Sequence, residues 1–133
     1  MDKKPIAIII EDEELLLQAI VSKMKKEGIE TISCSKAEQA LDYLSNMTIA
    51  PDVIWLDYYL EGGMNGIEFL EKIKQNPKWM QIPVLAVTNT ASPEKVDKMV
   101  ALGIVKYFVK AENKLEEMVK CAKQVAEKDP NLK

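Results

Sequence analysis

The chain of 133 residues carries a net charge of −3 at pH 7, with 47% hydrophobic and 29% charged residues, a balance typical of one globular domain. This acidic composition gives no reason to expect nucleic-acid binding, and no apolar run approaches the roughly 18 residues that a membrane span requires. The N-terminal apolar run is too short for a signal peptide. We therefore expect a cytoplasmic protein with a single domain over residues 1–133 and no membrane segment.

The sequence contains no histidine. This excludes Ser-His-Asp and Cys-His catalysis, histidine metal ligands and histidine phosphorylation within the chain. Acid-base or nucleophilic chemistry must then come from carboxylates, lysines, hydroxyls or a group supplied by a partner. Cys34 and Cys121 lie in separate segments without zinc-site spacing, so we expect two reduced, buried thiols rather than a disulfide.

The first third of the chain predicts two strands with a helix between them. Residues 5–10, PIAIII, have the continuous apolar character of a strand buried on both faces. Residues 29–34, IETISC, are predicted to form the second strand. The helix is expected to start at about Glu13 and to end at Gly28, a typical C-cap residue.

A second helix is predicted directly after the second strand. Ser35 with Glu38 three positions later has the pattern of a capping box. The third strand, DVIWL at 52–56, ends in front of Asp57. The apolar residues of the second helix recur at helical spacing; they are Ala37, Ala40, Leu41 and Leu44.

The remaining elements continue the alternation. A Gly-rich loop leads to a third helix that ends before Pro77, and residues 83–88 form the fourth strand. Ser92 and Pro93 then supply the N-cap and first residue of a fourth helix, which ends at Gly103. The third helix carries an apolar face of Ile67, Leu70 and Ile73.

A fifth strand at 105–110 and a last helix from about Lys114 to Lys128 complete the chain. Strands that alternate with helices predict a parallel sheet covered on both faces. Right-handed crossovers then give an α/β fold of the flavodoxin-like type, a doubly wound five-stranded sheet in the order 2-1-3-4-5. Ligands of such sheets bind outside the carboxyl ends of the strands.

Polar residues stand at the carboxyl ends of four predicted strands: Glu11 and Asp12 after the first, Asp57 after the third, Thr88 at the end of the fourth and Lys110 at the end of the fifth. Each has an ordinary explanation when taken alone. Acidic residues favour helix N-termini, threonine favours strands, and a single lysine is usually solvated. Their convergence on one edge of the sheet favours a functional site instead.

The charges at this edge favour a bound cation. Two carboxylates about 4 Å apart repel each other by about 4 kcal/mol at an effective dielectric constant of ~20. Lys110 offsets only one of the three negative charges of Glu11, Asp12 and Asp57. Mg²⁺ binds such carboxylates together with phosphate oxygens, and the arrangement suits phosphoryl transfer. A carboxylate can itself be the nucleophile, as in aspartyl-phosphate formation.

Four segments in this order resemble the receiver domain of two-component response regulators, and the resemblance covers essentially the whole chain. Each segment is a weak signal alone, whereas four in register form a strong one. They are IIIEDE (8–13), VIWLD (53–57), PVLAVT (83–88) and YFVK (107–110).

The resemblance implies that Asp57 accepts a phosphoryl group and that Glu11 and Asp12 form the acidic pair around Mg²⁺. It further implies that Asp57 and the backbone carbonyl of Tyr59 complete the protein ligands of the metal.

The family resemblance also implies a switch. Thr88 would hydrogen-bond the phosphoryl group, Lys110 would pair with its charge, and the Tyr107 ring would turn inward on activation. A half-buried strand tyrosine without a switching role is the competing interpretation of Tyr107.

The implied partners are a histidine kinase or histidine phosphotransferase as phosphodonor and a separate output protein, since we find no output domain in the sequence. A candidate output surface lies on the fourth helix, the fifth strand and the fifth helix, around Lys95, Met99, Lys106 and Tyr107. The competing interpretation is that these charges only solvate the helix.

The sequence departs from the family pattern at four places. Glu11 replaces the usual aspartate with the same charge, so metal binding should persist. Asn89 stands where the family favours a small residue, and Glu61 stands where it often has proline, in a loop one residue longer than usual. Ala111 replaces the usual proline, and because a non-proline cis bond costs roughly 2.5–4 kcal/mol, we expect a trans Lys110–Ala111 bond.

Tyr59 and Asn89 are also expected to tune the lifetime of the phosphorylated form. Both would flank the phosphoryl group and hinder the hydrolytic water, which predicts a long-lived aspartyl phosphate.

Three other functions remain open at this point. A haloacid-dehalogenase-type phosphohydrolase also uses an aspartate nucleophile, but it requires a second aspartate at the position of Tyr59. A flavodoxin-like cofactor binder needs a phosphate-cradling first loop, which the EDEE segment would repel. A degenerate receiver that serves only as a docking module is compatible with Asn89 and Ala111.

Overall fold

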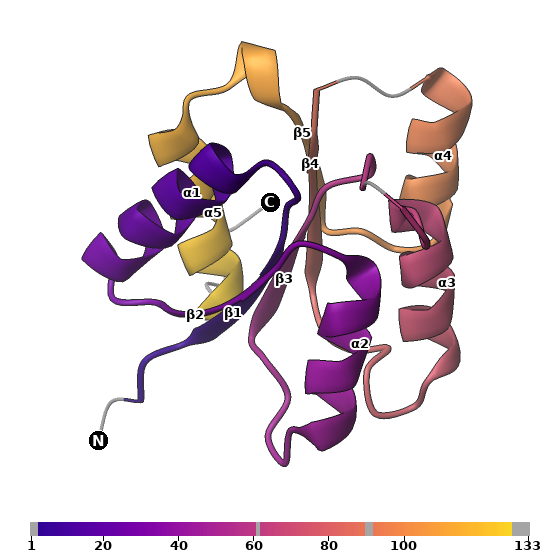
Figure 1. The fold of residues 1–133 in the computed structure, drawn as a ribbon, viewed down its shortest axis with the longest axis horizontal. Helices are drawn as coiled ribbons and strands as arrows, with labels where there is room; N and C mark the ends of the chain where they lie inside the picture. Colours follow the sequence, from indigo (N-terminus) through magenta and orange to yellow (C-terminus); the bar gives the residue numbers. More distant parts are fainter. Residues whose placement is uncertain (1–2, 61, 90–91, 129–133) are drawn as a thin grey trace.

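The computed structural model describes residues 3–60, 62–89 and 92–128. Within them five strands and five α-helices alternate, and the strands form one parallel sheet in the predicted order, β2-β1-β3-β4-β5 (Figure 1). The strands are β1 (Ile6–Ile10), β2 (Glu30–Cys34), β3 (Val53–Leu56), β4 (Val84–Thr88) and β5 (Lys106–Val109). The helices are α1 (Glu14–Lys26), α2 (Ala37–Asn46), α3 (Gly66–Gln75), α4 (Pro93–Ala101) and α5 (Leu115–Ala126).

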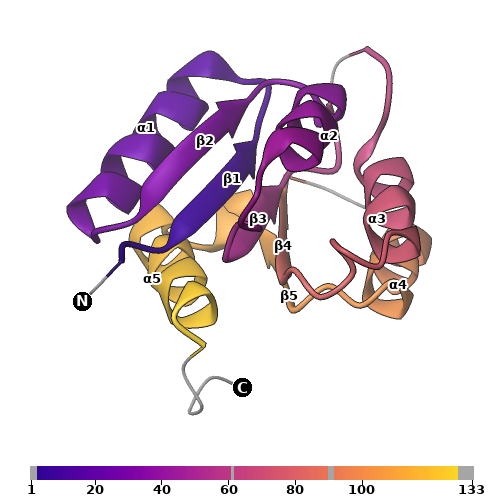
Figure 2. The ribbon, with the colours of Figure 1, turned by 90° about the horizontal axis from the view of Figure 1, so that it is seen from below.

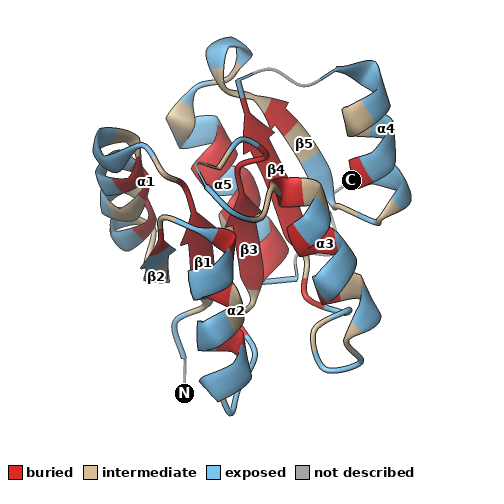
Figure 3. Ribbon diagram, turned by 45° about the vertical axis from the view of Figure 1, so that its right-hand side comes forward, coloured by how far each residue is buried: buried red, intermediate tan, exposed pale blue. Residues whose placement is uncertain are grey.

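The sheet is covered by α1 and α5 on one face and by α2, α3 and α4 on the other (Figures 1 and 2). The two-residue period of the strands explains how one apolar run serves both layers. In β1, for example, Ala7 and Ile9 pack on the α1/α5 side, whereas Ile8 and Ile10 pack on the other. The central strands β1, β3 and β4 are therefore buried on both faces (Figure 3).

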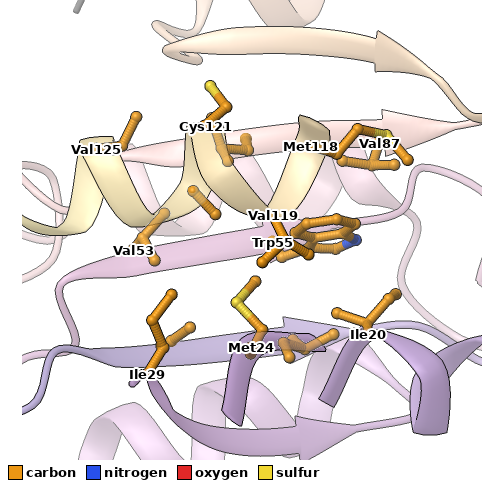
Figure 4. Close-up of a cluster of buried hydrophobic side chains, with 14 of the residues drawn as sticks. Ile20, Met24, Ile29, Val53, Trp55, Val87, Met118, Val119, Cys121 and Val125 are labelled. Atoms are coloured by element: carbon orange, nitrogen blue, oxygen red, sulfur yellow. The ribbon is translucent and has the colours of Figure 1, made fainter. Parts of the chain in front are cut away.

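The layer between the sheet and the α1/α5 pair is filled by aliphatic side chains around one indole ring. Trp55 of β3 lies between Met118 and Val119 of α5 and Ile20 and Met24 of α1 (Figure 4). Burial of such side chains contributes roughly 1.5–3 kcal/mol each. This layer holds α1 and α5 against the sheet and so fixes the loops at its carboxyl edge.

The strand register decides which polar residues meet at that edge. Ile10, the last residue of β1, is paired with Leu56, the last residue of β3. Glu11 and Asp57 therefore leave the two strands side by side, and the amide of Asp57 donates to the carbonyl of Ile10 at 3.1 Å.

The predicted capping box of Ser35 and Glu38 is wrong. The helix begins one residue later, and Gln39 serves its start: the Gln39 side-chain oxygen accepts from the amides of Ser35 at 2.7 Å and Lys36 at 3.2 Å. Glu38 instead accepts from the amide of Met64 at 3.0 Å. A tertiary hydrogen bond to the β3–α3 loop thus took the place of the local cap.

The predicted fifth strand is also too long at its end. β5 stops at Val109, and Lys110–Glu112 form a 3₁₀ turn that leads into α5. The Asn113 side chain stabilises this turn by donating to the carbonyl of Val109 at 2.9 Å. The Lys110–Ala111 peptide bond is trans, as predicted.

Two predictions on burial have different outcomes. Cys34 and Cys121 are buried and free, as expected. Met99, proposed as part of an output surface, is fully buried against the sheet and cannot form a surface. It is the apolar anchor of α4, whose other residues are exposed or half-buried.

Among the described residues, no helix has the length and apolar character needed to cross a bilayer.

Candidate functional site

A lysine and two carboxylates form a buried ion cluster at the carboxyl edge of the sheet. The Lys110 ammonium donates to Glu11 Oε1 at 2.7 Å and to Asp57 Oδ2 at 3.1 Å. Strand alternation explains the meeting, because these three positions continue the rows of β1, β3 and β5 that face α1 and α5. Their convergence was predicted from the residues that end the apolar runs.

Asp57 lies deeper than its place after the strand suggests. The residue is only 4% exposed, although it follows the last residue of β3 at the edge of the sheet. Its Oδ1 accepts from the amide of Tyr59 at 3.1 Å, while its Oδ2 accepts from Lys110. These bonds offset the cost of burying a carboxylate.

Burial and pairing perturb the pKa values of Glu11 and Lys110. Burial raises the pKa of Glu11 above its ordinary value; the Lys110 hydrogen bond opposes this rise and the charge of Asp57 adds to it. For Lys110, burial lowers the pKa, but the hydrogen bond that it donates to Glu11 and the charge of Asp57 outweigh this effect, so the pKa is raised. Lys110 is therefore a firmly held cation at neutral pH.

The acidic residues are spaced as a metal site requires. Glu11, Asp12 and Asp57 each offer a carboxylate oxygen, and these oxygens all lie within 4.8 Å of one another. Asp12 is half-buried, whereas the other two are buried. Hard divalent cations prefer such oxygen ligands, so the donor set fits Mg²⁺ or a similar ion.

Thr88 and Tyr107 lie on the opposite side of the sheet from Lys110. The residues of β4 and β5 that share their row pack against α2, α3 and α4. The Thr88 hydroxyl is buried and has no hydrogen-bond partner among the described residues. Such an orphaned hydroxyl is costly, and its position on the strand next to β3 makes it available to a group bound at Asp57. Tyr107 is half-buried.

Two tyrosines and a lysine border the site on the side of α4. Tyr59 is 46% exposed, and its hydroxyl lies 3.5 Å from the Lys95 ammonium. The same ammonium lies over the Tyr58 and Tyr59 rings, 4.9 and 5.1 Å from their centroids, which is a cation–π geometry. Lys95 thus ties the first turn of α4 to the residues that follow Asp57. Asn89 is exposed at the end of β4.

The first residue of α3 is a glycine that the sequence argument did not single out. A Cβ on Gly66 would lie 2.8 Å from the Cα of Tyr58 and 3.2 Å from the carbonyl oxygen of Asp57. The Gly66 amide donates to the Tyr58 carbonyl at 3.1 Å, so the loop closes directly onto the phosphoacceptor candidate.

The start of α3 carries a signal that points to this glycine. Asn65 and Glu68 form a reciprocal capping box, each accepting from the other's amide at 2.9 Å. An N-x-x-E pattern after a glycine-rich segment could have marked the helix start, and with it the glycine at N1. Glu61, at which we noted a departure from the family, lies outside the described residues.

Residues 7–123 match the family described as the response regulator receiver domain. The chain belongs to this family. It is 27% identical over 106 residues to the phosphate regulon transcriptional regulatory protein PhoB of Rhizobium meliloti, which covers 80% of this chain and 45% of that protein. It is 30% identical over 104 residues to the alkaline phosphatase synthesis transcriptional regulatory protein PhoP of Bacillus subtilis. This alignment covers 78% of this chain and 40% of that protein. The receiver chain therefore spans less than half the length of these relatives.

Solved receiver structures share the fold. The phosphorylated cyanobacterial phytochrome response regulator RcpA superposes with a TM-score of 0.79 at 22% identity, covering 94% of this chain and 93% of the other. The Mn(2+)-bound form of response regulator Rcp1 superposes with a TM-score of 0.81 at 24% identity, covering 97% of this chain and 99% of the other. At these identities the likeness establishes the architecture of the receiver and not the role of single residues.

Proposed function

We propose that this receiver domain is a phosphorylation-dependent switch in which Asp57 takes a phosphoryl group from a histidine kinase or histidine phosphotransferase. The observation that carries the proposal is the cluster itself: Lys110 bridges Glu11 and Asp57 within hydrogen-bonding distance, and a third carboxylate, Asp12, lies beside them. Structural ion pairs do not need a third carboxylate, whereas phosphoryl transfer needs this excess of negative ligands for a cation.

In the proposed reaction, a carboxylate oxygen of Asp57 attacks the phosphorus of a phosphohistidine. A new P–O bond forms as the P–N bond breaks, and the imidazole of the donor leaves. The amide of Tyr59, 3.1 Å from Oδ1, holds the carboxylate in place. Lys110 is positioned to stay beside Asp57 and pair with the added negative charge.

The fit of a cation follows from the donor set of Glu11, Asp12 and Asp57. The backbone carbonyl of Tyr59 is proposed as a further ligand. Mg²⁺ bound there would supply charge neutralisation for the transferring phosphoryl group. Only the ionised carboxylates bind a cation, so the affinity for the metal depends on pH.

The switch is proposed to use the buried hydroxyl of Thr88, which has no partner in the part of the chain that the structure describes. Phosphorylation adds roughly −1.5 to −2 charges and strong acceptor oxygens, and the hydroxyl would donate to one of them. Tyr107, on the same face of the sheet, would occupy the space that Thr88 leaves. Complete conversion of a 1:99 population to 99:1 needs about 5.5 kcal/mol, so we expect a partial shift of the population.

The output is proposed to pass to a separate protein through the α4–β5 face. Lys95, Lys106 and Tyr107 remain available there, since each is exposed or half-buried. The Lys95 contact with Tyr59 links this face to the residues next to Asp57, which gives phosphorylation a short route to α4.

Intact-mass measurement after incubation with Mg²⁺ and acetyl phosphate tests this function. We expect the mass of one phosphoryl group to appear on the wild-type protein and on Asp97→Asn, an exposed aspartate of α4, and to be absent from Asp57→Asn or after metal chelation. Labelling of Asp57→Asn would overturn the assignment of the acceptor. Steady phosphate release from many esters would favour a phosphohydrolase, and absence of labelling would favour a docking module.

A further inference from the structure

A small cavity lies behind the ion cluster, between the sheet and the α1/α5 pair. Its volume is about 150 Å³. Five of its eight lining residues are aliphatic or Met side chains, and Lys110 closes its end toward the proposed phosphorylation site; the lining consists of Leu16, Ile20, Trp55, Val87, Lys110, Asn113, Leu115 and Met118. The cavity is therefore distinct from the ion cluster of Glu11, Asp57 and Lys110, but the two share Lys110.

One polar atom of the lining lacks a partner. Trp55 is 1% exposed, and its indole N–H has no hydrogen-bond acceptor among the described residues. In Figure 4 the ring nitrogen lies at the end of the indole that faces away from Val53, in the gap between Ile20 and Met118. The same two residues line the cavity, so the unpaired donor points into it.

The side-chain donors of Lys110 and Asn113 in the lining already have acceptors. Lys110 donates to two carboxylates, and the Asn113 side-chain nitrogen donates to the Val109 carbonyl. A buried tryptophan N–H without an acceptor costs roughly 1–3 kcal/mol. An internal water needs two to four polar partners, and the wall around the indole N–H is largely apolar.

These features define the chemistry of an occupant. Its volume must be near that of a benzene-sized ring, which an apolar cavity of about 150 Å³ accommodates. It must carry one acceptor for the indole N–H. An anion is disfavoured because Glu11 and Asp57 lie just beyond Lys110, and a cation offers no acceptor. A compact neutral carbonyl compound meets all of these conditions.

We propose that the cavity is a binding site for a small neutral carbonyl ligand, such as a cyclic ketone, lactone or amide, held by a hydrogen bond from Trp55. The apolar part of the ligand packs against α1 and α5, and its oxygen accepts from the indole. Because the occupied cavity contacts Lys110, the ligand lies one residue away from the phosphoacceptor candidate.

Titration of ¹⁵N-labelled protein with cyclopentanone tests the proposal. The chain has two tryptophans, Trp55 and Trp79, and therefore two indole signals. We expect a saturable shift of the Trp55 indole signal while the Trp79 signal stays in place. Intermolecular NOEs from the ketone to Ile20 and Met118 should place it in the cavity. These measurements need no variant and do not depend on phosphorylation.

Two matched variants localise the binding. Leu16→Phe enlarges a side chain of the lining and should weaken the titration severalfold, whereas Leu15→Phe, at a neighbouring residue that is 77% exposed, should leave it unchanged. The proposal is overturned if the Trp55 indole does not shift saturably or if both indoles shift alike. It is equally overturned if a water NOE to the Trp55 indole persists at high ketone concentration.

Discussion

Removing the charge of Lys110 should expose the repulsion that this residue compensates. Lys110→Met keeps a side chain of similar length but leaves Glu11 and Asp57 buried without a cation. With carboxylate oxygens within 4.8 Å of each other, the repulsion is about 3 kcal/mol at an effective dielectric constant of ~20. Loss of one partner of a buried ion pair typically costs 3–5 kcal/mol. We expect the free energy of unfolding at neutral pH to fall by about 3 kcal/mol.

The loss should shrink in acid. The pKa of Glu11 in the folded protein is already raised by burial, and removal of the lysine raises it further. A carboxylate with a raised folded-state pKa destabilises the fold when ionised, so its cost is fully present above that pKa and disappears as the pH falls through it. Urea denaturation in metal-free buffer from neutral to mildly acidic pH measures this dependence.

The controls separate charge from packing. Lys120→Met changes the net charge by the same amount at an exposed position of α5 and should leave stability nearly unchanged. Glu11→Gln combined with Lys110→Met should recover most of the loss, because Asp57 then faces a neutral amide. An unchanged stability of Lys110→Met at neutral pH, or a loss that does not shrink in acid, would refute the electrostatic argument.

Three further predictions concern the surroundings of the cluster. Gly66→Ala should destabilise the fold by about 1–3 kcal/mol and abolish phosphoryl acceptance, because its Cβ would meet the Tyr58 backbone at 2.8 Å. The control Gly62→Ala, at a glycine with φ of +62° and open space around it, should lose stability but keep phosphoryl labelling. Equal labelling of both variants would contradict the argument. Tyr59→Ala should speed the loss of the phosphoryl mass from labelled protein, and an unchanged decay would show that this side chain does not shield the phosphate. Burial raises the pKa of Cys34 from its ordinary value of 9.0 to about 11, and since one pKa unit corresponds to about 1.4 kcal/mol, about 3 kcal/mol of stability should be lost as the pH rises from about 9 to 11. In denaturation experiments over the same pH range, Cys34→Ala should not show the stability loss that Cys34 ionisation causes. A pH profile identical to that of the wild type would refute this prediction.

The strands and their order could be predicted because the central strands are buried on both faces and leave unbroken apolar runs. The same runs located Asp57, Thr88 and Lys110 at one edge, since parallel strands end together. The two-residue alternation along each strand then decides the face: it places Lys110 with the carboxylates on one side of the sheet and Thr88 with Tyr107 on the other.

Features decided by tertiary competition could not be predicted. Glu38 had a local capping role available, but the amide of Met64 offered a better partner after the loop folded. Met99 was assigned to a surface because α4 is mostly polar, yet the helix needs one apolar residue to anchor it. The indole N–H of Trp55, which has no acceptor among the described residues, could not be predicted either, since an apolar run does not indicate where a cavity remains.

The central claim is that Asp57 carries the phosphoryl group, and trapping of the acyl phosphate tests it most directly. Protein treated with acetyl phosphate and Mg²⁺ is reduced with borohydride, which converts an aspartyl phosphate to homoserine, and the peptides are sequenced by tandem mass spectrometry. The proposed function predicts conversion at position 57 alone, and only when both Mg²⁺ and the phosphodonor were present. Conversion at Asp12 instead, or no conversion under these conditions, would contradict it.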